Sequence, residues 1–258
     1  MTDSLDLPRG FYHLHLPETD STMLCLLRPD LSARSEAFVL ATTDFQTAGH
    51  GQRGTVWEAA AGHNLLFSFA FHPTFVSAGG QFRLSEALAL AVAESLDGLP
   101  VEVSVKWPND IYAGNRKICG MLLEHDLRGT HIYNTRAGVG LNVNQRRFEG
   151  DAPNPVSMWQ LLGRDTERGP LLSAILHRFC AYYSLLRDGG AATVDERYAA
   201  RLYRREGLHP FSDANGRFSA CIHAVCPDGR LVLRDETGRL RTYAFKEVRF
   251  ETEEEGHE

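Results

Sequence analysis

Apolar and polar residues along the first half of the chain change repeatedly between strand-like and helix-like spacing. Over residues 101–107 every second side chain is apolar, which predicts a half-buried strand. Over residues 83–98 the apolar positions recur three and four apart, which predicts a helix with one buried face. Shorter apolar runs bounded by turn residues predict further strands at 11–17, 37–43, 64–71, 118–124 and 131–139.

Helical spacing returns in three other places. A short apolar stretch at 23–27 follows Asp20 and Ser21, either of which would cap the start of a helix. A longer stretch with one apolar face begins at Pro170, a residue suited to the first turn of a helix, and stops at two glycines. A further helix is expected over about 194–206.

The pattern changes in the last fifth of the chain. Apolar and polar residues alternate over 218–224, and turn-forming triplets at 227–229 and 236–238 separate the next apolar stretches. Four or five short strands within so few residues predict a small β-barrel or sandwich. We therefore expect two domains, one over 1–207 and a small β domain over 208–258.

Composition narrows the class of protein. The 258 residues are 43% hydrophobic and 23% charged, which is ordinary for a soluble globular protein. The formal net charge is −6 and no basic patch stands out, which disfavours binding to duplex DNA. The N-terminus does not resemble a secretory signal, and no apolar stretch is long enough to cross a membrane. The five cysteines form no C-x-x-C pair, which indicates free thiols in the cytoplasm rather than a zinc site.

The first candidate for chemistry is the glycine-rich stretch 49–54. It matches G-x-G-x-x-G, but no helix-forming stretch follows, so a dinucleotide-binding fold is disfavoured. The glycines alone are typical of a plain turn. The neighbouring Gln46, Arg53 and Trp57 favour a loop that wraps a nucleotide, because Arg53 and backbone N–H groups bind anions and Trp57 offers a flat face to a purine. The sequence contains no P-loop motif.

The second candidate comprises polar residues at the ends of two successive predicted strands. Lys106, Asn109 and Asp110 end the first strand, and Arg116 and Lys117 precede the next. Taken singly, these residues are typical of a solvated strand end and a turn. A hairpin would bring both groups to one rim, where two cations beside polar acceptors suit a polyphosphate with a magnesium ion.

The third candidate is the stretch G-V-G-L-N at 138–142. A strand that ends in a glycine turn would explain it without any function. The functional interpretation uses the glycines for close approach of a ligand and Asn142 as a polar contact. His13 and His15 would share one side of a strand, but without a third ligand we interpret them as surface residues or hydrogen-bonded core residues.

Five segments carry a resemblance to a known family: DST at 20–22, GHGQRGTVW at 49–57, KWPND at 106–110, RKICG at 116–120 and GVGLN at 138–142. In order and spacing they resemble the motifs of the biotin protein ligases, and their combination is highly specific. The resemblance covers about residues 10–145 and continues more weakly to the C-terminus. It implies an α+β fold of the class II synthetase-like type, with a mixed β-sheet flanked by helices and a small SH3-like β-barrel as the C-terminal domain.

The resemblance also implies an enzyme of two half-reactions that uses biotin, ATP and Mg²⁺. The biotin carboxylate attacks the α-phosphorus of ATP, which gives biotinyl-adenylate and pyrophosphate. The ε-amine of a lysine on a biotin carboxyl carrier protein domain, as in acetyl-CoA carboxylase, then attacks the mixed anhydride and releases AMP. Such an enzyme would act in the cytoplasm as a monomer or homodimer.

Residue by residue, the resemblance implies three sets of contacts. Biotin would be held by Ser21, Thr22, Gln46, Gly49, Gly51 and Lys117. The nucleotide would be held by Arg53, Gly54, Trp57, Lys106, Asn109 and Asn142. Lys117 and Arg53 would be the catalytic residues, which stabilise charge as it develops on the reacting groups, and Asp110 would help to hold magnesium.

The sequence departs from the family pattern in two respects. His50 and Gln52 stand where relatives often carry arginine, so we expect biotinyl-adenylate to be held less tightly. The first motif begins at Asp20, which leaves no room for an N-terminal helix-turn-helix, so we expect neither DNA binding nor repressor function. Two alternatives remain open: a lipoate or octanoate ligase of the same superfamily, and a non-catalytic nucleotide-binding module.

Overall fold

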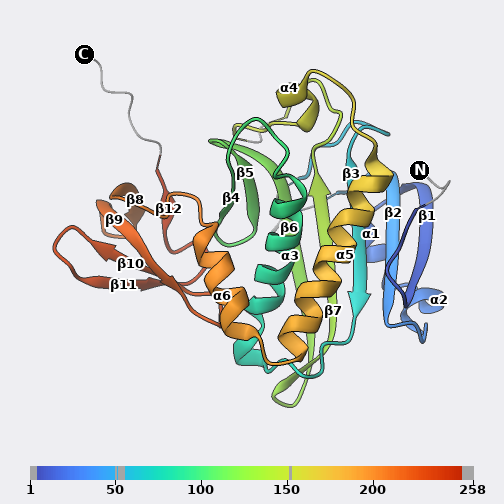
Figure 1. Ribbon diagram of the computed structural model, residues 1–258, viewed down its shortest axis with the longest axis horizontal. Coiled ribbons are helices and arrows are strands. Elements are labelled where there is room, and N and C mark those ends of the chain that lie inside the picture. Colours follow the sequence, from blue (N-terminus) through green and yellow to red (C-terminus); the bar gives the residue numbers. More distant parts are fainter. Residues whose placement is uncertain (1–4, 50, 52–55, 151–152, 252–258) are drawn as a thin grey trace.

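The described part of the chain forms a large and a small β-sheet, with helices packed on the large sheet (Figure 1). The computed structural model describes residues 5–49, 51, 56–150 and 153–251. The large sheet has the strand order β1-β2-β3-β7-β6-β5-β4. Its strands are β1 (Phe11–Thr19), β2 (Phe38–Gln46), β3 (Leu65–Phe71), β4 (Val103–Lys106), β5 (Asp110–Ala113), β6 (Arg116–Arg128) and β7 (His131–Leu141).

The large sheet is mixed. β1 runs parallel to β2, and the other neighbouring pairs of strands are antiparallel. Two short helices, α1 (Thr22–Cys25) and α2 (Pro29–Ser32), lie on the connection between the parallel strands. β4, β5, β6 and β7 follow one another as successive hairpins, which brings strand ends from distant motifs side by side.

The two faces of the large sheet carry different side chains. Phe67, Phe69 and Phe71 of β3 are buried on one face, and the rings of Phe69 and Phe179 lie 4.8 Å apart. Phe179 belongs to helix α5 (Arg168–Arg187), which covers this face beside α3 (Phe82–Ser95) (Figure 1). Successive residues of a strand point to opposite faces. Ser68 therefore belongs to the other face, against which α1 packs.

Helix α3 is buried around most of its circumference. It contacts the sheet, α5 and a third helix, α6 (Ala191–Ala200). The sequence pattern predicted one buried face, but the buried positions include Glu86 and run almost continuously along the helix. Because apolar side chains surround it, α3 forms the centre of the hydrophobic core.

The small sheet follows α6 and has the strand order β11-β10-β9-β8-β12. It is antiparallel and rich in tight turns, as the sequence predicted. Its outer strands, β11 and β12, are not paired with each other, so the described strands form an open sheet rather than a closed barrel. The strands are β8 (His209–Asp213), β9 (Gly216–Val225), β10 (Leu231–Asp235), β11 (Leu240–Tyr243) and β12 (Arg249–Phe250).

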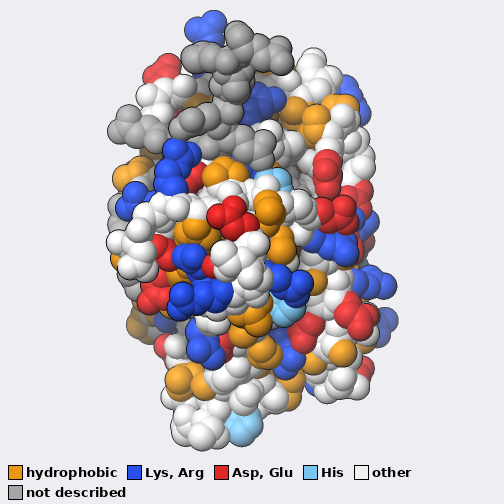
Figure 2. Space-filling view, turned by 90° about the vertical axis from the view of Figure 1, so that its left-hand side faces the viewer, with side chains coloured by type: hydrophobic (Ala, Val, Ile, Leu, Met, Phe, Trp, Pro, Cys, Tyr) orange, Lys and Arg blue, Asp and Glu red, His pale blue; other side chains and the backbone are white. Residues whose placement is uncertain are grey.

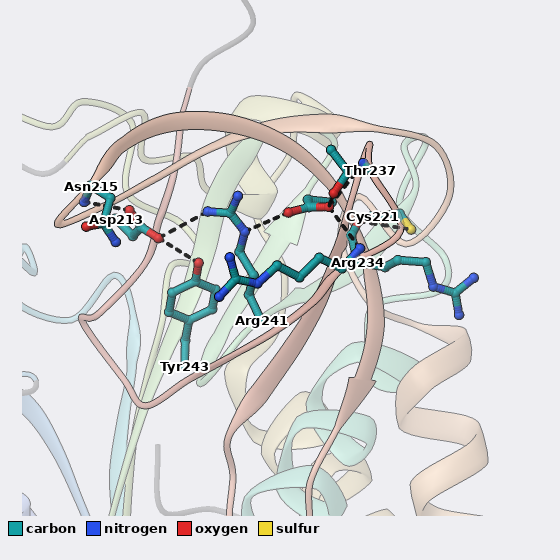
Figure 3. A network of polar contacts seen from close by, with 9 residues as sticks. Asp213, Asn215, Cys221, Arg234, Thr237, Arg241 and Tyr243 are labelled. Carbon is teal, nitrogen blue, oxygen red and sulfur yellow. Dashed lines mark hydrogen bonds and ion pairs between the residues drawn. The ribbon is translucent and has the colours of Figure 1, made fainter.

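A network of charged and hydroxyl groups stabilises the small sheet (Figure 3). Arg241 Nε donates to Asp235 at 2.9 Å, and the Tyr243 hydroxyl donates to Asp213 at 2.7 Å. Hydrogen bonds to Asp235, foremost that from the Thr237 hydroxyl, lower the pKa of this carboxyl to about 2. Because these groups satisfy one another, we assign the network a structural role.

The small sheet packs on the turn that follows β4. Trp107 Nε1 donates to the Gly229 carbonyl at 2.9 Å, and the Trp107 ring lies 6.1 Å from that of Phe245. Buried apolar residues of both sheets belong to one contiguous core, so the division into domains at residue 207 stays a prediction. On the molecular face at this end, positive and negative side chains are interspersed (Figure 2).

The structure confirms the α+β class and adds elements that the sequence pattern did not indicate. Residues 110–113 form β5 rather than only a turn, and short helices form at α2 and at α4 (Met158–Leu162). Ser21 is the N-cap of α1, but its side chain makes no capping hydrogen bond. The Asp20 carboxylate instead accepts from the Ser21 N–H at 2.6 Å, so the predicted side-chain cap is wrong.

Two further features bear on the setting of the protein. The helices of the described residues lack the combination of length and apolar composition that a membrane span needs. All five cysteines are free, with Cys25 and Cys119 buried and the others partly exposed. His13 and His15 are half-buried on β1 and both contact the Thr42 hydroxyl, which confirms their interpretation as hydrogen-bonded residues.

Candidate active site

Four register partners form a row across the large sheet. Lys106 of β4 pairs with Asp110 of β5, Asp110 with Gly120 of β6, and Gly120 with Gly140 of β7. Directly paired residues on neighbouring strands lie on the same face of a sheet. The row therefore brings the second and third sequence motifs together on the face opposite to α5. Arg116, expected to join them, is exposed.

Three glycines of this face leave room for side chains to lie directly on the backbone. A Cβ on Gly140 would lie 2.4 Å from Trp57 Cε2, and one on Gly120 would lie 2.9 Å from Trp57 Cζ3. A Cβ on Gly138 would lie 2.9 Å from Met23 Cγ. We call Gly120, Gly138 and Gly140 the glycine floor. Any side chain there would displace the indole or the thioether.

Trp57 presents an unpaired donor at this floor. Its Nε1 is buried and has no hydrogen-bond partner among the described residues. Its backbone N–H donates to the Gly49 carbonyl at 3.0 Å, which ties the two ends of the glycine-rich stretch together. Buried donors in folded proteins are nearly always paired, so the free Nε1 is a ready contact for a ligand acceptor.

Lys117 lies beside the indole and is paired with Asp110. Its Nζ is 2.7 Å from Asp110 Oδ1 and 5.6 Å from the centre of the Trp57 ring. About a quarter of each side chain of the ion pair is exposed, at 27% for Lys117 and 24% for Asp110. The Lys117 backbone is anchored by hydrogen bonds to Asn154 and Val156. A partly exposed ammonium held in this way can neutralise an anionic group that binds beside the indole.

A polar cluster stands beside the floor, at the start of α1. Gln46 Oε1 accepts from the Thr22 N–H at 2.8 Å and from the Thr22 hydroxyl at 3.0 Å. The Thr22 and Ser68 hydroxyls lie 2.6 Å apart. Gly49 stays close to this cluster, because a Cβ there would lie 2.8 Å from Gln46 Nε2. Ser21 precedes the cluster and is buried.

Asn142 contributes a second unpaired polar atom. Its Nδ2 donates to the Val156 carbonyl at 3.1 Å, but its Oδ1 is buried and has no partner among the described residues. The side chain is 3% exposed, so the carbonyl oxygen is held in place. It can accept a hydrogen bond from a ligand that reaches the end of β7.

Lys106 and Asn109 are engaged with the protein itself. Lys106 Nζ donates to the Tyr112 hydroxyl at 2.9 Å and lies 5.4 Å from the Phe250 ring centre. Burial lowers the pKa of Lys106, and the charge of Asp110 partly offsets this effect. The Asn109 amide donates to the Met121 carbonyl. Their predicted contacts with a nucleotide stay predictions.

Several predicted site residues lie outside the described residues: Arg53, Gly54, His50 and Gln52. Gly51 is described and half-buried. Between residues 56 and 64 no helix follows the glycine-rich stretch, as expected for a loop rather than a dinucleotide-binding turn.

Sequence reasoning missed three residues of the site. Ser68 lies between phenylalanines in an apolar strand, and only its alternation with them indicates the opposite face. Gly120 was quoted in a motif but given no role, although it pairs with Gly140. Met23 was noted only as part of the apolar stretch 23–27, whereas its side chain lies against the floor.

Sequence comparison connects these features to a family. A sequence model described as the Biotin/lipoate A/B protein ligase family matches residues 16–142. The biotin–[acetyl-CoA-carboxylase] ligase of Paracoccus denitrificans is 28% identical over 87% of this chain and 95% of its own length. The chloroplastic biotin–protein ligase 1 of Arabidopsis thaliana is 33% identical over 65% of this chain and 45% of its own. The chain thus spans about half the length of several curated relatives it matches.

Structural comparison agrees on the fold. The biotin protein ligase of Aquifex aeolicus in complex with biotin and ATP superposes with a TM-score of 0.76, over 93% of this chain and 99% of that one. The two sequences are 22% identical, so this similarity establishes the fold alone.

Proposed function

This chain belongs to the biotin/lipoate A/B protein ligase family, and we propose that it joins biotin to protein at the expense of ATP. It forms biotinyl-5′-AMP from biotin and ATP, and it transfers the biotin to a lysine of a biotin carboxyl carrier protein domain. One observation carries this proposal: the matched residues, 16–142, include the whole glycine floor, Trp57 and the Lys117–Asp110 ion pair. The curated relatives named as biotin ligases support biotin as the acid.

The polar cluster and the glycine floor suit the two parts of biotin. Thr22, Gln46 and Ser68 offer hydroxyl and amide groups that both donate and accept, as recognition of a ureido ring requires. The Trp57 indole and the Met23 thioether, which lie on the glycine floor, offer an apolar surface to the remainder of the ligand. In this arrangement the carboxylate of biotin points towards Lys117.

Lys117 is the proposed catalytic residue of the first half-reaction. A biotin carboxylate oxygen bonds to the α-phosphorus, the bond from that phosphorus to the bridging oxygen breaks, and pyrophosphate leaves. The Lys117 ammonium stabilises the charge that gathers on the reacting oxygens. No protein nucleophile is required, because positioning and charge stabilisation suffice for phosphoryl-type transfer. Trp57 Nε1 and Asn142 Oδ1, which lack a partner in the described part of the chain, are the proposed polar contacts for the nucleotide.

Magnesium fits this site best as part of the substrate. The predicted ligand, Asp110, is paired with Lys117, and no three His, Cys, Asp or Glu side chains in the described ranges meet as a metal site. Magnesium usually keeps several waters and takes only one or two protein carboxylates beside substrate phosphates. We therefore propose that the ion arrives bound to the phosphates of ATP, with the Asp110 carboxylate close by.

In the second half-reaction the neutral ε-amine of the acceptor lysine attacks the biotinyl carbonyl carbon. The bond from that carbon to the phosphate oxygen breaks, AMP leaves, and the nitrogen loses one proton to solvent. The identity of the acceptor protein, action as a monomer or homodimer, and independence from DNA stay predictions. Free thiols support the cytoplasm as the place of action.

ATP–pyrophosphate exchange tests the proposal. Wild-type protein with MgATP and labelled pyrophosphate should exchange label only when biotin is added. Lipoate and octanoate are the comparison acids. Exchange that depends on lipoate or octanoate instead would move the activity to the neighbouring ligases of the family. Absence of exchange with all three acids, from folded protein, would leave a nucleotide-binding module.

Replacement of Lys117 separates catalysis from binding. Lys117→Ala should lower biotin-dependent exchange by about 100-fold or more, because charge stabilisation in the transition state is lost. The matched control is Arg128→Ala, which removes an exposed cation at the far end of the same strand. Exchange within a factor of two of wild type in Lys117→Ala would contradict the assigned role.

A further inference from the structure

Glu58, the residue after Trp57, makes three hydrogen bonds to a different loop. Its carboxylate accepts from the backbone N–H groups of Glu149 and Gly150, both at 2.9 Å. It also accepts from Gln145 Nε2 at 3.2 Å. The approach is close, because a Cβ on Gly150 would lie 2.8 Å from Glu58 Oε2.

Gln145 extends these contacts into the core. Its Oε1 accepts from the Ala60 N–H at 3.0 Å and from Asn64 Nδ2 at 2.5 Å. Its Nε2 donates to the Arg147 carbonyl at 3.0 Å as well as to Glu58. Gln145 is 3% exposed and Asn64 is fully buried. Every hydrogen-bonding position of the Gln145 amide is therefore used, which fixes its orientation.

These bonds link the indole to the strand beneath it. Residues 58–60 directly follow Trp57, and residues 145–150 are separated by three residues from the end of β7, which carries two glycines of the floor. Asn64 Oδ1 accepts from the Val143 N–H at 3.0 Å, which adds the start of β3 to the same assembly. The Trp57 backbone N–H donates to the Gly49 carbonyl at 3.0 Å. The geometry around Glu58 thus limits where the indole can lie.

We propose that Glu58 is a positioning residue, which holds Trp57 on the glycine floor through Gln145 and the N–H groups of residues 149 and 150. We call Glu58, Gln145, Glu149 and Gly150 together the Glu58 clasp. The role of the clasp in catalysis rests on the proposed function, because it assumes that Trp57 contacts the nucleotide. Its effect on the indole does not depend on any activity.

The clasp needs a carboxylate. Two backbone N–H groups and one amide N–H converge on Glu58, and an ionised carboxylate accepts from all of them. In Glu58→Gln the amide of nearly the same shape keeps one acceptor oxygen, and its NH2 group would face at least one of these N–H donors. Gly150→Ala attacks the same contact from the other side, because the new Cβ would push the carboxylate away. The matched control is Glu102→Gln, which changes an exposed carboxylate in the same way.

The first measurement is acrylamide quenching of Trp57 in the absence of substrates. The contribution of Trp57 is obtained by subtraction of a Trp57→Phe partner for each variant, since Trp107 and Trp159 also emit. Glu58→Gln and Gly150→Ala should each raise the quenching constant of Trp57, and Glu102→Gln should not. An unchanged constant in both variants would overturn the clasp, whether or not the protein is an enzyme.

The second measurement is the kinetics of biotin-dependent exchange. Glu58→Gln should raise the KM for ATP roughly tenfold, while kcat changes by less than about threefold, because the loss falls on ground-state positioning. The double variant Glu58→Gln/Gly150→Ala should be no worse than either single one, since both break the same contact. The positioning role would be overturned if the effects of the two substitutions on the KM for ATP were additive. It would also be overturned if the quenching constant of Trp57 rose while the KM for ATP stayed unchanged. Absence of exchange in the wild type would count against the proposed function and leave the quenching result intact.

Discussion

Gly140 is both a residue of β7 and the residue on whose backbone the Trp57 indole lies. Its place in the row opposite Gly120 follows from strand register, and its lack of a Cβ lets the Trp57 indole lie on the backbone. The sequence indicated a glycine turn with room for a ligand. It could not indicate that a tryptophan more than 80 positions earlier would fill that room, because no local pattern records contacts between distant segments.

Gly140→Ala should weaken substrate binding without unfolding the protein. A Cβ 2.4 Å from Trp57 Cε2 forces the indole off the floor, and overpacking of this kind costs about 1–3 kcal/mol. We expect the KM values for ATP and biotin to rise by roughly tenfold or more. The control is Gly98→Ala, where nothing lies within 4 Å of the added Cβ. Equal kinetics for the two variants would mean that the indole can lie elsewhere at no cost.

Other single residues show where sequence reasoning stopped. Thr22, Gln46, Trp57 and Lys117 were predicted as site residues, and the structure places them around one floor. Lys106 was predicted to face the nucleotide, but its ammonium contacts the Tyr112 hydroxyl. Which partner a cation selects depends on the distances in the folded hairpin, and these are not encoded in spacing along the chain.

Helix α3 shows the same limit for a secondary-structure element. Its spacing predicted a helix with one buried face, and the charged Glu86 is not among the apolar positions that defined that face. In the structure α6 covers the side that carries Glu86, so Glu86 is 3% exposed. Burial, followed by the charge of Asp195 on α6, raises the pKa of Glu86 to about 8, while Arg83 opposes the shift. Periodicity identifies a polar position, but it does not reveal which second helix will cover it.

β5 and α4 were missed because they are too short to show a period, although the capping box of Ser157 and Gln160 was visible in the sequence.

The buried Glu86 should make stability depend on pH between about 5 and 8. Its folded pKa, about 8, lies above the ordinary value of 4.5, so the folded state binds more protons in this window. Stability contributed by the neutral form is present below pH 4.5 and is lost as pH rises towards 8. Each pKa unit corresponds to about 1.4 kcal/mol, so the loss should reach several kcal/mol. Tyr198 is a further titratable neighbour of Glu86: burial, followed by the charge of Glu86, raises the pKa of its hydroxyl.

Urea unfolding at several pH values measures this effect. Glu86→Gln should remove most of the decline in unfolding free energy between pH 5 and pH 8. The control is Glu196→Gln, which lies exposed on α6 and should keep the wild-type slope. A wild-type curve as flat as that of Glu86→Gln would show that Glu86 stays ionised in the folded state.

On the scale of the whole molecule, the two sheets share one core. The buried apolar cluster contains Leu231 and Phe211 of the small sheet together with residues of β3 and α3. The sequence texture predicted two domains because strand spacing changes after residue 207. The spacing of apolar residues indicates local structure, whereas the burial of one sheet against another depends on surfaces that form only after folding. The sequence therefore predicted both parts of the fold but not their union.

Calorimetry tests whether the sheets unfold as one unit. We expect a single transition whose calorimetric and van't Hoff enthalpies agree. Gly229→Ala should lower the stability by about 1–3 kcal/mol more than Gly238→Ala, since a Cβ on Gly229 would lie 2.7 Å from Phe82 and one on Gly238 meets nothing within 4 Å. Both glycines have a positive φ, at 91° and 86°, so backbone strain cancels in the comparison. Two separate transitions would instead support independent domains.

The glycine floor also limits how this site can evolve. Every amino acid that replaces Gly120 or Gly140 brings a Cβ, and that first atom already meets the indole. No substitution at these two positions is small enough to avoid this contact. The side chains around the floor, such as Met23 and Gln46, are not limited in this way, because substitutions there can change size or polarity in small steps. We therefore expect relatives that evolved from this protein to accept a different acid to differ in these surrounding side chains and to keep the glycines of the floor.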